Sequence, residues 1–462
     1  MRAILLAAGL VAAVSGTARA DQRFDATLAG HAILPAATFA QPPADAPPAL
    51  ATSGRFTGPG NLRIEQRGSL PGDTGAVHGR RPTGLSLPFQ GQPVQGFSGI
   101  KPVAGEAGAY WVLTDNGFGN RRNSADTMLM FHKLRPDFRA GTVAVERTIF
   151  LSDPNRVVPF PIVNETSDRR YLTGADFDPE SIQPVADGFW IGEEFGPFLI
   201  KVDLEGRVQR LVPTKLGEEE IRSPDNPALQ LPASPTGTVA FRSQRSGGYE
   251  GMALSPDGSR LYALLEKPLF QANGQVEGQF LRILELDTAR GEWTGRSLKY
   301  RFEPGGVSIG DFNMVDERRA LIIERDDGEG DPSLACAGGP NRPAENTPPA
   351  CFPSPARLKR IYLVDLQATD SEGFVRKIGH IDLMAVRDPE GLGRGHGDRA
   401  ASVPNDRFTF PFFTIENVAV VDADHIIVGN DNNLPFSAGR RLTAADSNEL
   451  ILLRVPELLR AR

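Results

Sequence analysis

The chain has little cysteine and histidine, with two Cys and six His among 462 residues. The histidines are not clustered, so a zinc, iron or copper centre has no support. Basic residues are the minority charge, with 50 Lys and Arg against 57 Asp and Glu, which argues against a nucleic-acid partner. No Walker loop, Rossmann fingerprint or nucleophile elbow stands in a suitable context. Cations, neutral molecules and small anions remain as partners.

Long apolar runs are absent after the first twenty residues, so no later segment is expected to span a bilayer. Residues 1–20 combine an early Arg2, an apolar run over residues 3–14 and a small-residue ending at Ala20. This pattern is typical of a signal peptide that is cut after Ala20. We therefore expect a periplasmic or secreted protein that acts as a monomer on a small molecule.

The two cysteines, Cys336 and Cys351, flank a segment rich in Pro, Gly and Asn. In an exported protein such an isolated pair predicts a disulfide. The bridge would close one local loop.

Helical periodicity is scarce, whereas short apolar runs bounded by Gly, Pro, Asp and Asn recur along the chain, which predicts an all-β protein. Five segments share a more specific shape, in which a short strand, a turn and a second strand that ends on an acid follow one another. They are residues 97–115, 180–194, 250–266, 311–324 and 416–431. Third and fourth strands follow four of these pairs, and four antiparallel strands per repeat are the composition of a propeller blade.

The fifth repeat ends on a third strand, so we expect the N-terminal segment 26–35 to supply the fourth and close the ring. The prediction is a single β-propeller domain over residues 21–462, with five blades and long loop insertions. A sixth blade within residues 50–96, where residues 61–68 are strand-like, stays open. A pair of β-sandwiches is the alternative fold.

In a blade of this kind the first strand starts, and the second strand ends, on the same face. Nine acids and one serine are therefore expected around one mouth of the central channel. They are Ser98, Asp115, Glu180, Glu194, Glu250, Glu266, Asp311, Glu324, Glu416 and Asp431. Crowded carboxylates raise one another's pKa or recruit a cation. Oxygen ligands without Cys or His favour calcium or magnesium, and a wide, flexible ring favours Ca²⁺.

Two cations, Lys267 and Arg325, follow directly on acids of this ring. They either neutralise the carboxylates or hold an anionic group such as phosphate against the metal. A carboxylate that the metal does not fully engage, Glu250 or Glu194, would orient an attacking water. These four residues are the predicted catalytic set.

Several blocks of the sequence, among them GFSGI, DPESIQPVADGFWIGEEFGP, GGYEGMALSPDGSRLYALLE and IENVAVV, resemble the phytase-like family, also described as esterase-like activity of phytase. The resemblance spans roughly residues 95–455. It implies an exported β-propeller with a phosphoester or ester hydrolase activity, and kinship with calcium-dependent propeller phytases.

Three functions are open at this point. The first is a calcium-dependent phosphoric ester hydrolase that works through the carboxylate ring. The second is a calcium-dependent lactonase or carboxylic-ester hydrolase that uses the same ring. The third is a periplasmic binding or scaffold propeller whose acids hold a structural calcium.

Overall fold

The computed structural model describes residues 22–58, 70–73, 82–229, 241–337 and 351–462. The regular structure of these residues is almost entirely β, with one short helix, α1 (Pro456–Arg460), near the C-terminus. No helix in the described ranges is long and apolar enough to cross a membrane. The expected signal peptide and the strand-like segment 61–68 lie outside the described residues.

Twenty of the strands form five sets of four. They are β8 (Phe97–Pro102), β9 (Tyr110–Thr114), β10 (Met130–Asp137) and β11 (Thr142–Phe150); β12 (Pro179–Val185), β13 (Gly188–Glu193), β14 (Phe198–Val202) and β15 (Val208–Pro213); β18 (Tyr249–Leu254), β19 (Arg260–Leu265), β20 (Phe280–Asp287) and β21 (Glu292–Arg301); β22 (Ser308–Met314), β23 (Arg319–Arg325), β24 (Lys359–Thr369) and β25 (Val375–Asp382); and β28 (Thr414–Val420), β29 (His425–Asp431), β30 (Asn448–Arg454) and β1 (Thr27–Leu34).

Shorter strands lie in the connections. They are β2 (Phe39–Ala40), β3 (Thr52–Ser53), β4 (Leu70–Asp73), β5 (Pro82–Leu87), β6 (Phe89–Gln90), β7 (Gln92–Pro93), β16 (Lys215–Leu216), β17 (Glu219–Glu220), β26 (Val386–Arg387) and β27 (Arg407–Phe408).

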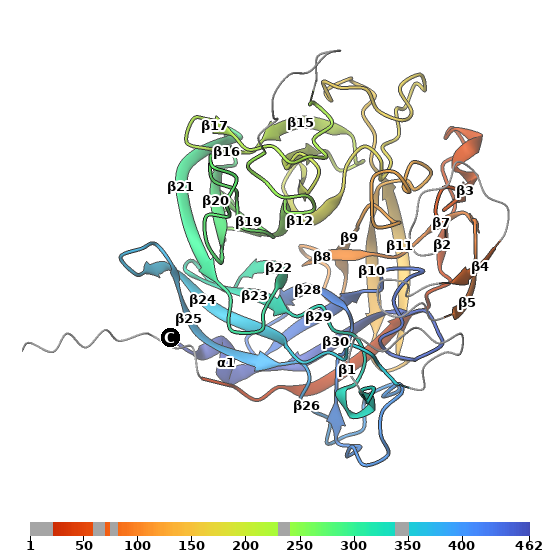
Figure 1. Cartoon of the computed structure of the whole chain (residues 1–462), viewed down its shortest axis with the longest axis vertical. Coiled ribbons are helices and arrows are strands. Elements are labelled where there is room, and N and C mark those ends of the chain that lie inside the picture. Colours follow the sequence, from red (N-terminus) through yellow and green to blue (C-terminus); the bar gives the residue numbers. More distant parts are fainter. Residues whose placement is uncertain (1–21, 59–69, 74–81, 230–240, 338–350) are drawn as a thin grey trace, which may run out of the picture.

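Each set is an antiparallel meander, and the first strands of the sets contact one another in sequence. β8 contacts β12, β12 contacts β18, β18 contacts β22, β22 contacts β28, and β28 contacts β8 again. Figure 1 shows these strands near the centre, with β11, β15, β21 and β25 farther out. The arrangement is propeller-like, and the fold is all-β as the sequence predicts.

The N-terminal strand β1 pairs antiparallel with the C-terminal strand β30, from Thr27 opposite Arg454 to Leu34 opposite Asn448. On its other side β1 meets β11 in a parallel contact between Ile33 and Thr142. The two ends of the chain therefore share one sheet.

The core consists of apolar clusters between neighbouring sets of strands. In β9, Trp111 and Leu113 pack against the second set, while Tyr110 and Val112 face the fifth set. Successive side chains of a strand point to opposite faces, and both faces are covered here, so the strand is apolar throughout. The ring centroids of Phe131 and Phe189 are 4.6 Å apart across one such layer.

The connection between β23 and β24 carries the disulfide. Cys336 and Cys351 are bonded with an S–S distance of 2.08 Å. The predicted pairing is confirmed.

Candidate functional site

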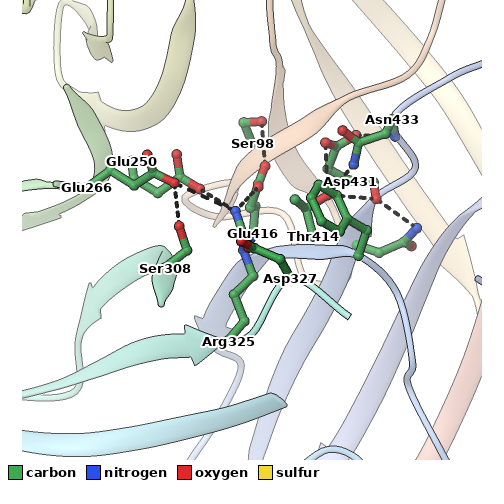
Figure 2. Close-up of polar contacts among 12 residues, drawn as sticks. Ser98, Glu250, Glu266, Ser308, Arg325, Asp327, Thr414, Glu416, Asp431 and Asn433 are labelled. Atoms are coloured by element: carbon green, nitrogen blue, oxygen red, sulfur yellow. Dashed lines mark hydrogen bonds and ion pairs between the residues drawn. The ribbon is translucent and has the colours of Figure 1, made fainter. Parts of the chain in front are cut away.

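A cavity of about 330 Å³ lies at the centre of the five sets, where first strands begin and second strands end. Its lining contains nine carboxylates, namely the exposed Asp327 and eight that belong to the inner strands and their ends. These eight are Asp115, Asp178, Glu180, Glu194, Glu250, Glu266, Glu416 and Asp431. Seven of them are buried, and Asp115 is partly buried. Figure 2 shows the half of this cavity around Arg325.

One row of the cavity comes from the ends of the second strands. Backbone pairing places Asp115, Glu194, Glu266 and Asp431 at equivalent positions in four sets. Arg325 holds the same position in the fourth set, where it pairs with Ser308. Four carboxyl groups and one guanidinium therefore lie at this level.

A second row comes from β-bulges in the first strands. Pro179 pairs with Glu193 and Ser181 with Gly192, which leaves Glu180 as the extra residue. The same shift occurs around Glu250 and around Glu416. A bulge re-aims a side chain out of the regular pleat, and here it brings three acids to the cavity wall.

Arg325 lies among three acids from two other sets (Figure 2). Its Nη2 is 3.3 Å from Glu416 Oε1, 3.8 Å from Glu266 Oε1 and 3.9 Å from Glu250 Oε1. Hydroxyl groups complete this half, since Ser98 donates to Glu416 at 3.1 Å and Ser308 donates to Glu266 at 2.6 Å. This half is an ion-pair network around one guanidinium.

The other half holds a tight acidic triad, which forms no ion pair with a Lys or Arg among the described residues. Oxygens of Asp178, Glu180 and Glu194 all lie within 4.8 Å of one another. Asn116 donates to Asp178 through its backbone nitrogen at 3.2 Å and its side-chain amide at 2.7 Å. These bonds hold the side chain of Asp178 in place, and Glu180 and Glu194 face one another beside it.

Burial and mutual repulsion raise the pKa values of several carboxyl groups at this site. Burial raises the pKa of Asp178 to about 6. Burial, followed by the charges of neighbouring acids, holds the pKa values of Glu180 and Glu194 well above their usual range. In Asp431, burial and the nearby Glu416 raise the pKa to about 8. At neutral pH the metal-free cavity therefore retains protons that a cation could displace.

Two carboxylate oxygens of the cavity are buried without a hydrogen-bond partner. They are Oε1 of Glu194 and Oε1 of Glu250. An orphaned anionic oxygen is costly, so each points to a missing proton, water or cation. Among the lining residues, Lys267 and Arg325 are the two cations, and Lys267 Nζ is 3.3 Å from Glu266 Oε2. Hard oxygen donors in this number suit a divalent cation such as Ca²⁺.

The structure brings together nine of the eleven residues that the sequence singles out for catalysis or metal binding. Asp311 and Glu324 lie elsewhere. Asp311 is buried in the channel and paired with Lys101 Nζ at 2.9 Å. Glu324 accepts hydrogen bonds from Tyr300 at 2.6 Å and from Lys377 at 2.7 Å.

Both displacements follow from the register of the fourth set. Because Arg325 occupies the end position of β23, Glu324 falls one residue earlier and points to the other face. Likewise Gly310, and not Asp311, stands at the place of Glu180, Glu250 and Glu416 in the bulge. A side chain at 310 would meet the carbonyl oxygen of Ile415 at 2.2 Å, so glycine is required there.

Asp178 is the main residue that the sequence reasoning did not select. It precedes β12 by one residue, and it stands two residues before Glu180. The period of two in an extended chain places both on one side, and this spacing was the available signal.

The family model described as "Phytase-like: Esterase-like activity of phytase" matches residues 92–434. The chain belongs to the phytase-like family. The resemblance seen in the sequence is thereby confirmed, and the matched region contains all nine cavity carboxylates.

Similarity to individual proteins is more limited. An uncharacterized secreted protein of Arthroderma benhamiae is 29% identical over 138 residues, which are 27% of this chain and 26% of that protein. The chain thus spans about a quarter of the length of the curated relative it matches.

Among solved structures, a luciferin-regenerating enzyme is 10% identical over 78% of this chain and 77% of its own, with a TM-score of 0.34. A GH43 β-1,3-galactosidase with galactodeoxynojirimycin is 12% identical over 79% and 91%, with a TM-score of 0.37.

Proposed function

We propose that this phytase-like protein is a calcium-dependent ester hydrolase, with phosphoric esters as its substrates. The observation that carries the proposal is one cavity with nine carboxylates, two cations and two carboxylate oxygens that lack a hydrogen-bond partner. Such an excess of buried negative charge is stable only with protons or a bound cation. The family membership supports hydrolysis of an ester bond.

The acidic triad is the proposed metal site. Asp178, Glu180 and Glu194 offer hard oxygens within 4.8 Å of one another, and Glu194 has an oxygen without a partner. Asp115 and Asp431 line the same cavity and would extend the ligand set. When bound, a divalent cation supplies Lewis acidity and lowers the pKa of a water molecule.

The remaining residues have roles of their own. Burial, followed by the charges of neighbouring acids, raises the pKa of Glu250 well above its usual range, so this carboxyl can hold or accept a proton at physiological pH. We assign it to the attacking water. It would take a proton from this water as the water oxygen bonds to phosphorus or carbon, while the bond to the alcohol oxygen breaks and the departing alcohol takes up a proton. Arg325 and Lys267 would steady the negative oxygens of the substrate.

A carboxylic ester or a lactone is the second candidate substrate, and the family description favours it. The same cavity would serve, since the charge that develops on an acyl oxygen needs the same electrophiles. A non-catalytic binding or scaffold propeller with a structural calcium is the alternative that the experiment below separates from both.

The finer features of the fold belong to the same proposal. The five four-stranded sets would be five blades of one domain over residues 21–462, and β1 would complete the fifth blade and close the ring. The disulfide is consistent with export after cleavage behind Ala20. We propose a monomer in the periplasm or outside the cell.

The test is an activity screen of the mature protein on aryl phosphate, bis-aryl phosphate, aryl acetate and lactone substrates, in calcium and in chelator. Phosphoester turnover that needs calcium supports the proposal. Glu250→Gln should lower kcat by at least about 100-fold, whereas the exposed control Glu205→Gln should not change it. Turnover of acetate or lactone alone would select the second candidate. Stabilisation by calcium without any turnover would support the non-catalytic scaffold.

A further inference from the structure

A second cavity, of about 760 Å³, adjoins the carboxylate cavity. Its wall is largely apolar and aromatic, and it includes Pro268, Phe280, Phe302, Val307 and Phe374. We call it the aromatic groove. Val307 lines both cavities, and Pro268 directly follows the cavity residue Lys267. The groove and the proposed reaction site therefore meet at Val307.

The segment between β21 and β22, residues 302–307, forms one wall of the groove. In Figure 1, β21 lies toward the rim and β22 near the centre, so this segment leads from the rim to the carboxylate cavity. The backbone nitrogen of Val307 donates to the carbonyl oxygen of Arg325 at 3.0 Å. Val307 is thus held beside the backbone of Arg325, the residue whose guanidinium lies among the cavity acids.

Glu324 holds the same wall from behind. Its Oε1 accepts from the backbone nitrogen of Glu303 at 2.7 Å. A Cβ at Gly306 would meet that oxygen at 2.2 Å, so only glycine permits the close approach. The register of the fourth set turns Glu324 away from the acidic cavity, and there it holds the wall of the groove.

The far end of the groove is aromatic. Phe280 and Phe374 meet edge to face, with ring centroids 5.6 Å apart. The guanidinium carbon of Arg301 is 3.9 Å from the centroid of Phe374. Rings fixed in this way form a firm apolar surface. At the near end Val307 is 52% exposed, the highest value among the exposed large apolar side chains of the described residues.

We propose that the aromatic groove receives an apolar arm of the substrate, an aryl or acyl group, while the ester group lies in the carboxylate cavity. This inference rests on the proposed hydrolase function. The junction at Val307 places the apolar arm next to the ester, as a single molecule requires. Apolar and aromatic walls with a few polar groups are typical of sites that bind the carbon skeleton of a ligand. The preferred substrates are therefore hydrophobic esters and not polyphosphorylated sugars.

The test uses binding of 2-naphthol, which carries the apolar arm without an ester, measured by its fluorescence. The wild-type protein should bind it, and Val307→Ser should weaken binding about fivefold, the equivalent of losing about 40 Å² of apolar contact. Phe280→Ala should weaken it as well. Val421→Ser is the matched control. Val421 is 38% exposed and directly follows the C-terminal end of β28, whereas the carboxylate cavity lies at the N-terminal end of that strand.

Kinetics separate this inference from the proposed function. For the ester class that the protein hydrolyses, the naphthyl ester should have a lower KM than the methyl ester, and Val307→Ser should reduce that difference. If 2-naphthol does not bind, or if neither groove variant changes its affinity, the proposed role of the groove is wrong even if esters are hydrolysed. Binding that depends on Val307 without hydrolysis would uphold the groove and refute the enzyme.

Discussion

Neutralising Asp178 should stabilise the metal-free protein at alkaline pH. Burial raises the pKa of this carboxyl from 3.8 to about 6, which corresponds to about 3 kcal/mol. The folded state therefore binds more protons than the unfolded state between pH 4 and pH 6, and the free energy of unfolding falls as pH rises through that window. Above pH 6 the ionised Asp178 lowers the free energy of unfolding by this full amount, and Asp178→Asn removes that loss.

Thermal unfolding in chelator at pH 5 and pH 8 measures the effect. At pH 8 the variant should unfold a few degrees above the wild type, and at pH 5 the two should differ less. Calcium should reverse the order, because the wild type gains about 2.7 kcal/mol at a calcium concentration 100 times its Kd, whereas the variant has lost a ligand.

The exposed Glu205→Gln serves as the control and should follow the wild type throughout. A variant that is less stable than the wild type at pH 8 in chelator would refute the reasoning, because it would mean that the ionised Asp178 is not under strain. Equal calcium responses of the two proteins would remove Asp178 from the metal site.

Three further predictions follow from the packing. Arg325→Met should destabilise the protein by about 3–5 kcal/mol in chelator at pH 8, since three acids lose their cation, and by clearly less in calcium; equal losses of Tm would contradict this. Deleting residues 22–34 should lower the free energy of unfolding by at least about 5 kcal/mol, because the buried Leu28 and Leu34 are lost and the edge of β30 is exposed. An unchanged Tm would refute ring closure by β1. Reducing Cys336–Cys351 should speed amide exchange only in the β23–β24 connection, and faster exchange in β22 would speak against a local role.

The strands were accessible from the sequence because both faces of most inner strands are covered. A run such as Tyr110–Leu113 is apolar throughout and alternates between two clusters, which makes it recognisable as a buried strand. The isolated cysteine pair and the block order of the family were equally direct signals. Each of these features is local in the chain.

The composition of the site depends on backbone register, which a single sequence does not specify. Glu324 and Arg325 are neighbours, and pairing of Arg325 with Ser308 decides which of them faces the cavity. The bulges act in the same way, because an extra residue turns Glu180 and Glu250 toward the cavity while Asp311 pairs with Lys101 inside the channel. The groove wall depends on a contact between Glu324 and Glu303, which no motif marks.

Calcium binding to the metal-free protein tests the central claim most directly. Isothermal titration at pH 7.5 should show at least one tightly bound Ca²⁺ per chain, with protons released as the carboxyls of the triad ionise. Glu194→Gln removes one triad charge at the oxygen that lacks a partner, and it should weaken the affinity at least about tenfold. Wild-type protein that takes up no calcium and releases no protons would contradict the account.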